Sequence, residues 1–521
     1  MRIIKTAFIL AALVIVALEV AGVAGHAQAP VVTSPASSAS LAAPTLPAVQ
    51  APASSTGRGY TIPVVDLAAE TARQVVVDRE AGQYLGHPTT VLLEDGRTMI
   101  AVYPKGHGRG AIVMKRSRDG GRTWSERLPT PASWTSSLEV PTIFRTVDAR
   151  GVKRLLLFSG LYPIRLSVSA DDGMTWSELA PIGNFGGIVA MASMVALKTG
   201  RGHYMALFHD DGRFFEEPAH VMGAPAPSNP APPGAQPVRA QPPAPAPAPP
   251  GAPPGPPPAG QASNFGQRAF KVYKTVSTDG GLTWSAPEVI AAHPEAHLCE
   301  PGIIRSPDGR QLAVLLRENS RKFNSFLITS DDEGKTWSAP RELPAALTGD
   351  RHVARYAPDG RLFITFRDTT LESATKGDWV GWVGRYEDIV RGREGAYRVR
   401  LMKNHQDADC AYPGLELLPD GTFVTTTYGH WTAGEQPYIV SVRFRIDELD
   451  RRRAELDRRP RKPRSALQFP EKLGEPVEAA FSTAPPLDRA EVDPLAAGNR
   501  DGEAETLAVV PVVEGSETIP A

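Results

Sequence analysis

One short turn occurs four times in this chain, and it limits the possible folds more than any other feature. The pattern Ser-x-Asp-x-Gly-x-Thr-Trp begins at Ser117, Ser169, Ser277 and Ser330. In each copy the Ser or Asp side chain can bond backbone amides, Gly can adopt a positive φ, and Trp can fill the space between neighbouring sheets. Because a catalytic group is needed only once, four equivalent copies indicate an architectural role.

Between these turns the pattern is that of β-hairpins. Short runs of β-branched and aromatic residues are separated by Asp-Gly turns, as in VLLEDGRTMIAVY, IIRSPDGRQLAVLLR, ARYAPDGRLFITFR and LELLPDGTFVTTTY. Two looser versions are IFRTVDARGVKRLLLFS and MVALKTGRGHYMALFH. Six hairpins repeating about every 40 to 55 residues predict an all-β radial array of sheets.

The segments around these hairpins have different compositions. Residues 1–29 have a basic start, an apolar run and then small residues, which predicts a signal peptide. Residues 30–57 form an Ala/Pro/Ser-rich linker, and about 216–261 form a Pro-rich insertion that we expect to be disordered. We assign 58–450 to the β domain and 451–521 to a charged, largely disordered tail. The protein is therefore expected to be secreted or periplasmic, without stable membrane insertion unless the signal stays uncleaved.

The overall composition excludes some partners. The formal net charge of −1 provides no global field to recruit nucleic acid or an anionic membrane. We find no phosphate-binding loop and no zinc pattern, so neither a cofactor nor a metal is expected. An exported chain this long with only Cys299 and Cys410 relies on its core for stability. The sequence leaves open whether these two cysteines pair, and we expect a monomer.

Aligning the hairpins on their turn Asp brings reactive side chains into register. Eight residues before that Asp stand His87, Glu300, Arg351 and Tyr412. Eight or nine residues after it stand Tyr103, Arg317, Arg367 and Tyr428. Residues at matching registers share a face, so both sets should meet at one end of the array. Their chemical diversity favours a binding face, and the alternative is a ring of satisfied polar residues around a channel.

The repeated turn resembles the Asp-box of the sialidase (neuraminidase) superfamily, whose BNR repeats form six-bladed β-propellers. The resemblance covers roughly residues 84–445. It implies that a strand near 60–80 closes the ring with the last blade. The implied blades are about 84–126, 138–178, 186–286, 298–340, 351–391 and 410–445.

The same resemblance implies roles for particular residues. Sialidases use a Tyr nucleophile near the start of the last blade, and AYPGLELLPDGT puts Tyr412 there. Glu300 in LCEPGIIR corresponds to the Glu that accepts the proton of that Tyr. Arg317 and Arg367 correspond to the pair that holds the substrate carboxylate, with Arg351 in reserve. A free phenol has a pKa near ~10, so such a Tyr needs a base to attack at neutral pH.

Two departures from the family pattern concern the first blade. The family has a clamp Arg where this chain has YLGHPTTVL, so His87 takes its place as a candidate substrate-binding residue. The family also has an acid/base Asp in the following loop, which here reads YPKGHGRGA. We predict His107 as the acid/base, because an imidazole titrates near neutral pH, and Arg109 as a further substrate-binding residue.

Two weaker clusters complete the candidates. FHDDGRFF contains His209, Asp210 and Asp211, which could line the rim of the site. NHQDADCAY contains His405, Asp407 and Asp409, whose spacing matches no familiar metal loop.

We predict a sialidase-like exo-glycosidase that removes terminal acidic sugars, such as sialic acid, from glycoconjugates. Two alternatives remain open. A polysaccharide lyase could use Tyr and His to remove the proton α to a uronic-acid carboxylate that Arg residues neutralise. A non-catalytic propeller could bind glycans only.

Overall fold

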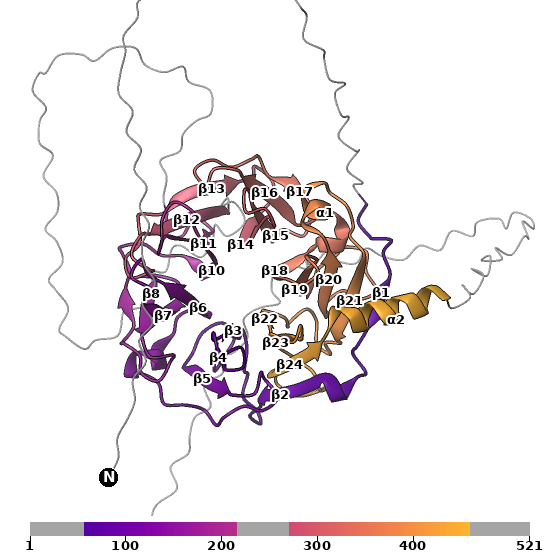
Figure 1. Cartoon of the computed structure of the whole chain (residues 1–521), viewed down its shortest axis with the longest axis horizontal. Helices are drawn as coiled ribbons and strands as arrows, with labels where there is room; N and C mark the ends of the chain where they lie inside the picture. Colours follow the sequence, from indigo (N-terminus) through magenta and orange to yellow (C-terminus); the bar gives the residue numbers. More distant parts are fainter. Residues whose placement is uncertain (1–56, 216–269, 459–521) are drawn as a thin grey trace, which may run out of the picture. The chain divides into compact units, whose positions relative to one another are not determined.

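The computed structural model describes residues 57–215 and 270–458. Within them, six β-sheets stand around a common axis, each with its first strand innermost (Figure 1). Adjacent inner strands contact one another around the whole ring. The predicted six-bladed β-propeller is therefore confirmed. The signal peptide, the Pro-rich insertion and the tail beyond residue 458 lie outside the described residues, as does the linker up to residue 56.

The six sheets follow the chain in order, with one hairpin leading each blade. Blade one consists of β3 (Thr89–Leu92), β4 (Met99–Pro104) and β5 (Ile112–Ser117). Blade two consists of β6 (Pro141–Val147), β7 (Lys153–Ser159), β8 (Arg165–Ser169) and β9 (Ala180–Pro181). Blade three consists of β10 (Ile188–Ala196), β11 (Tyr204–Asp210), β12 (Lys271–Ser277) and β13 (Glu288–Ala292).

The second half of the ring repeats this plan. Blade four consists of β14 (Leu298–Arg305), β15 (Leu312–Glu318), β16 (Phe326–Ser330) and β17 (Arg341–Glu342). Blade five consists of β18 (Gly349–Tyr356), β19 (Leu362–Asp368), β20 (Trp379–Gly384) and β21 (Tyr397–Met402). Blade six contains β22 (Gly414–Leu417), β23 (Phe423–Gly429) and β24 (Tyr438–Phe444). The α-helices are α1 (Tyr386–Val390) and α2 (Ile446–Arg458).

The N-terminal segment closes the ring by hydrogen bonding. Strand β2 (Gln74–Asp78) pairs antiparallel with β24 and completes blade six, as the family resemblance implied. Strand β1 (Val64–Asp66) adds in parallel to β21 at the edge of blade five, which the sequence pattern did not predict. Backbone bonds between the two ends of the domain thus hold the propeller closed.

The four repeated turns have the structural role expected of them. In the third copy, Asp279 Oδ1 accepts the N–H groups of Leu282 and Thr283, each at 3.0 Å. Ser277 Oγ accepts the N–H of Gly281 at 2.8 Å. The indole of Trp284 packs edge-on against Phe158 of blade two, with 5.7 Å between ring centroids. Each turn therefore satisfies its own backbone and presents a Trp to the neighbouring blade.

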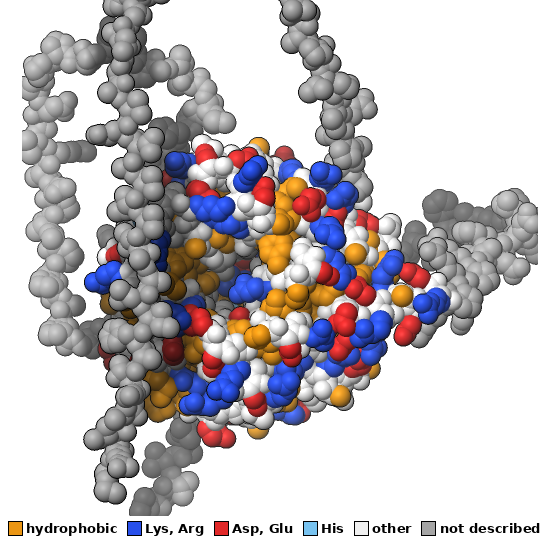
Figure 2. Space-filling model, viewed as in Figure 1, with side chains coloured by type: hydrophobic (Ala, Val, Ile, Leu, Met, Phe, Trp, Pro, Cys, Tyr) orange, Lys and Arg blue, Asp and Glu red, His pale blue; other side chains and the backbone are white. Residues whose placement is uncertain are grey.

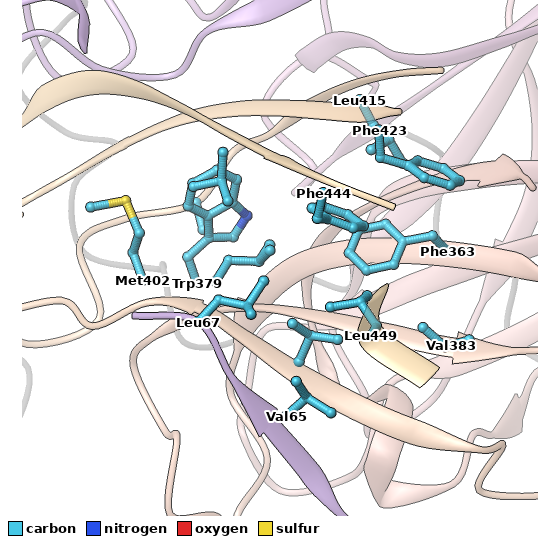
Figure 3. Close-up of a cluster of buried hydrophobic side chains, with 14 of the residues drawn as sticks. Val65, Leu67, Phe363, Trp379, Val383, Met402, Leu415, Phe423, Phe444 and Leu449 are labelled. Carbon is cyan, nitrogen blue, oxygen red and sulfur yellow. The ribbon is translucent and has the colours of Figure 1, made fainter. Parts of the chain in front are cut away.

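The hydrophobic core is divided into clusters that lie between adjacent blades. Figure 3 shows part of one cluster, where Phe363 of blade five meets Phe423 and Phe444 of blade six. Their ring centroids lie 5.5 and 4.6 Å from that of Phe363. Leu449 of α2 is fully buried in the same cluster. The first turns of α2 therefore pack against the blades, and the domain end predicted at residue 450 falls inside this helix.

Two further observations concern the surface and the thiols. On the face seen in Figure 2, acidic and basic side chains are interspersed. Among the described residues, none of the helices combines the length and apolar character needed to cross a membrane. Cys299 and Cys410 are both buried free thiols, so the two cysteines do not form the disulfide that the sequence left open.

Substitution of an Asp-box carboxylate should destabilise the propeller without affecting the site. Asp279→Ala removes the acceptor for two N–H groups and the Thr283 hydroxyl, so we expect the free energy of unfolding to fall by ~1–2 kcal/mol. Urea unfolding followed by tryptophan fluorescence measures this. Thr278→Ala, an exposed neighbour in the same turn, is the matched control and should unfold like the wild type. Equal stability of all three proteins would contradict the assigned role.

Candidate functional site

Three of the side chains predicted for catalysis and binding form one hydrogen-bonded group. The hydroxyl of Tyr412 donates to Glu300 Oε1. Arg317 Nη1 donates to the same carboxylate oxygen and, at 2.9 Å, to the Tyr412 hydroxyl. Tyr412 and Glu300 are 8% and 3% exposed. Residues from blades four and six therefore meet at one end of the channel, as the register alignment predicted.

A carboxylate that the sequence analysis missed holds the arginines. Asp350 is fully buried and pairs with Arg317 Nε at 3.1 Å and with both Nη atoms of Arg321 at 2.6 and 2.8 Å. Arg367 adds contacts to Asp350 Oδ2 from Nε at 2.9 Å and Nη2 at 2.7 Å. Burial alone would raise the pKa of Asp350, but Arg317, Arg367 and Arg321 outweigh it and lower that pKa.

The other two predicted clamp residues lie beside this group. The guanidinium of Arg367 lies 5.4 Å from the centroid of the Tyr412 ring, and its Nη1 donates to the carbonyl of Ala408 at 2.5 Å. Arg351 is 4% exposed and donates to the carbonyl of Ala192 at 2.7 Å. Both cations act on Tyr412 through their charge. The predicted Arg set therefore surrounds the Tyr412–Glu300 pair.

His87 has neighbours that fix its tautomer. The N–H of Gly108 donates to His87 Nδ1 at 3.1 Å, so the ring proton must be on Nε2, which lies 3.2 Å from the Tyr428 hydroxyl. That hydroxyl donates to Asp409 at 3.1 Å. Burial, His107 and nearby guanidiniums lower the pKa of His87 well below its usual range. His87 is thus neutral, and both of its nitrogens are in use, so it cannot replace a clamp Arg as a cation.

The loop predicted to supply the acid/base lies over His87. The imidazole of His107 stacks on that of His87, with 4.9 Å between centroids, and its centroid lies 5.4 Å from that of Tyr84. Both His107 and Arg109 are exposed. His107 is therefore at the rim of the site, one ring away from Tyr412, which lies 4.5 Å from His87.

The two weaker clusters from the sequence analysis lie beside the site and bond to its neighbouring residues. His209 Nδ1 faces the N–H of Glu300 at 3.4 Å, and Asp210 accepts N–H groups of its own loop. Asp409 accepts the hydroxyl of Tyr84 at 2.8 Å and borders a cavity of about 680 Å³. Within the described part of the chain, no cluster of three or more His, Cys, Asp or Glu could hold a metal ion.

Several inner strands begin with strained backbone. His87, Glu300, Arg351 and Ala411 have φ values of 53°, 46°, 58° and 60°, in the left-handed region that non-glycine residues rarely adopt. The pairing register shifts next to Glu300 and Arg351, which shows that these strands bulge. Such bulges turn side chains away from simple alternation and toward the axis, and they cluster at functional sites.

Comparison with known proteins agrees with this architecture. A family model described as "BNR repeat-like domain" matches residues 258–387. A solved structure of a protein of unknown function from Dyadobacter fermentans is similar at TM-score 0.50 and 14% identity, over 71% of this chain and 97% of that one. The chain is therefore a six-bladed β-propeller that contains a BNR repeat-like segment. No curated protein sequence matches it.

Solved structures titled as sialidases align with this chain at lower TM-scores. The Hadza microbial sialidase Hz136 aligns at TM-score 0.44 and 15% identity, over 70% of this chain and 66% of that chain. The intramolecular trans-sialidase from Ruminococcus gnavus aligns at TM-score 0.44 and 13% identity, over 70% and 95%. At these identities the similarity concerns the fold, and the chemistry has to be argued from the residues of the site.

Two carboxyl groups near the candidate site were not predicted from the sequence, and each has a structural reason. Asp350 directly precedes Arg351, and strict alternation would put the two on opposite faces; the bulge in β18 brings both to the site. Glu139 precedes the looser hairpin of blade two, which has no Asp-Gly turn for alignment. Counting back from Asp148, the residue that closes this hairpin, would have found Glu139 within one position of the matched register.

His209 should make the stability of the propeller pH-dependent. Burial, with a smaller effect of Arg317, lowers the pKa of His209 to about 3, whereas an unfolded His titrates near ~6.5. From pH 6.5 down to about 3 the unfolded chain binds a proton that the folded chain does not, so stability falls as pH falls. His209→Gln should reduce this slope by up to about 1.4 kcal/mol per pH unit.

Urea unfolding between pH 7 and pH 4.5 measures that slope. The matched control is His405→Gln, which changes an exposed histidine and should keep the wild-type slope. An unchanged slope in His209→Gln would show that His209 titrates normally in the folded protein.

Proposed function

We propose that this protein is an exported sialidase-like exo-glycosidase that hydrolyses terminal acidic sugars from glycoconjugates, with Tyr412 as the nucleophile. The observation that carries this proposal is the hydrogen bond from the Tyr412 hydroxyl to Glu300, bridged by Arg317. A phenol, a carboxylate and a guanidinium in direct contact are the groups that a Tyr-based glycosidase needs.

The environment of Tyr412 suits an attack on an anionic sugar. Burial, reinforced by the charge of Glu300, raises the pKa of Tyr412 above that of a free phenol. The resting nucleophile is therefore neutral and does not repel a negatively charged substrate. As the phenol oxygen bonds to the anomeric carbon, its proton passes along the existing hydrogen bond to Glu300. Arg317, which contacts both oxygens, stabilises the negative charge that develops between them.

The charge balance of the site favours an anionic ligand. Four guanidinium groups, from Arg317, Arg321, Arg351 and Arg367, stand near the two carboxylates Asp350 and Glu300. A planar guanidinium binds a carboxylate in a fixed orientation, which favours a sugar acid over a neutral sugar. Sialic acid is the sugar acid suggested by the structural neighbours titled as sialidases. For protonation of the leaving oxygen, His107 is the candidate predicted from sequence.

Hydrolysis of a fluorogenic aryl α-sialoside by the purified full chain tests this function. We expect Tyr412→Phe to lower kcat by at least ~10³-fold, because it removes the attacking oxygen and leaves the fold intact. Tyr356→Phe, which removes a hydroxyl bonded to the carbonyl of Arg305, is the matched control and should keep wild-type turnover.

Failure of the folded wild-type chain to release the fluorophore would contradict the proposal. Incubation with uronic-acid glycans would then test the lyase alternative, because elimination yields an unsaturated product that absorbs ultraviolet light. Binding of sialosides without any turnover would support the glycan-binding alternative.

A further inference from the structure

Glu139 is a carboxyl group at the reacting end of the channel. It stands two residues before β6, nine before Asp148, which closes the blade-two hairpin. This is within one residue of the position that His87, Glu300, Arg351 and Tyr412 occupy in their own blades. Because equivalent positions of the inner strands lie at one end of the ring, Glu139 belongs with them.

The contacts of Glu139 put its carboxyl under the loop that carries His107. Its Oε1 accepts the N–H of Val140 at 3.0 Å, and the N–H of Val189 in blade three also stabilises the carboxyl. A Cβ added at Gly108 would lie 3.7 Å from this Oε1. The same Gly108 donates its N–H to His87. Glu139 and His87 thus lie on either side of one loop, and His87 is in ring contact with Tyr412.

The charges around Glu139 favour its protonated form. Burial is the main cause that raises the pKa of Glu139, and the negative charge of Glu300 raises it further. Arg213 and Arg351 act in the opposite direction, but Arg213 is bound bidentately by Asp211 at 2.8 and 2.5 Å. A carboxyl with a raised pKa near a second carboxyl matches the division of labour between acid and base in glycosidases.

We propose that Glu139 is the acid/base catalyst of the reaction, an inference that rests on the proposed glycosidase function. In the first step the proton of Glu139 goes to the glycosidic oxygen while the bond from that oxygen to the anomeric carbon breaks. Tyr412 forms its bond to the same carbon and gives its own proton to Glu300. The products are the free leaving alcohol, an aryl glycoside in which the sugar is bonded to the Tyr412 oxygen, ionised Glu139 and protonated Glu300.

The second step restores every group. Ionised Glu139 takes a proton from water as the water oxygen bonds to the anomeric carbon. The bond from that carbon to the Tyr412 oxygen breaks, and Glu300 returns its proton to the phenolate. No group outside the site and no co-reactant other than water is needed. The carboxyl thus supplies the function that the family assigns to an Asp missing from the first blade.

His107 and Glu139 can be separated by the dependence of rate on the leaving group. An alcohol such as lactose leaves only when protonated, whereas 4-nitrophenolate leaves without help. For Glu139→Gln we expect kcat/KM to fall at least ~100-fold on α-sialyl-lactose and less than ~10-fold on 4-nitrophenyl α-sialoside. Azide, which attacks without losing a proton, should restore turnover of the nitrophenyl substrate and yield a glycosyl azide.

Three variants make the result specific. His107→Gln should lower kcat/KM by the same factor on both substrates. Glu416→Gln changes another buried carboxyl, in the axial cavity of about 140 Å³ where it accepts from Thr90, and should keep the wild-type ratio. Glu139→Asp, which shortens the side chain by one methylene, should show the same leaving-group dependence more weakly. It provides the test if the Gln variant does not fold.

Two results would overturn the proposal while the glycosidase function stands. One is a Glu139→Gln protein in which kcat/KM falls equally on the two substrates or does not fall at all, although Tyr412→Phe abolishes turnover of both substrates. The other is a leaving-group split that appears in His107→Gln instead. Absence of turnover of either substrate by the wild-type chain would overturn both the proposed function and this inference.

Discussion

The carboxylate of Asp350 is surrounded by three guanidinium groups, and the geometry of the site depends on that contact. A fully buried carboxylate is tolerated only when it is paired and hydrogen-bonded, and Arg317, Arg321 and Arg367 meet this need from blades four and five. The same ion pairs hold the three arginine side chains in place. Arg317 is then aimed at Glu300 and the Tyr412 hydroxyl, so one buried charge orients the pair that carries the proposed chemistry.

The repeated turns and the differing side chains at the axial end have separate roles in this propeller. The Asp-box turns repeat because each blade must satisfy a tight turn and present a Trp to its neighbour, as Asp279 and Trp284 do. At the axial end, equivalent positions hold His87, Glu300 and Arg351, which share a left-handed backbone but no chemistry. A regular scaffold thus holds one asymmetric site, and three of the residues at that site adopt a left-handed backbone.

The sequence predicted the number of blades and their order because hairpin turns are local signals, and the family resemblance implied the closing strand. It also brought Tyr412, Glu300 and Arg317 together by counting from the turns. Asp350 was missed because the bulge in β18 breaks the alternation on which counting relies, and Glu139 because its hairpin lacks an Asp-Gly turn. The tautomer of His87 depends on Gly108 and Tyr428, which only the three-dimensional arrangement brings into contact with it.

Covalent trapping tests the central claim, that Tyr412 attacks the sugar, most directly. A 2,3-difluorosialic acid carries a fluorine beside the anomeric carbon that slows hydrolysis of a glycosyl-enzyme, so the intermediate can be detected by mass spectrometry of the intact and digested protein. We predict one added sugar per chain, located on Tyr412 and absent from Tyr412→Phe. A chain that turns over sialosides but is labelled at another residue, or not at all, would contradict it.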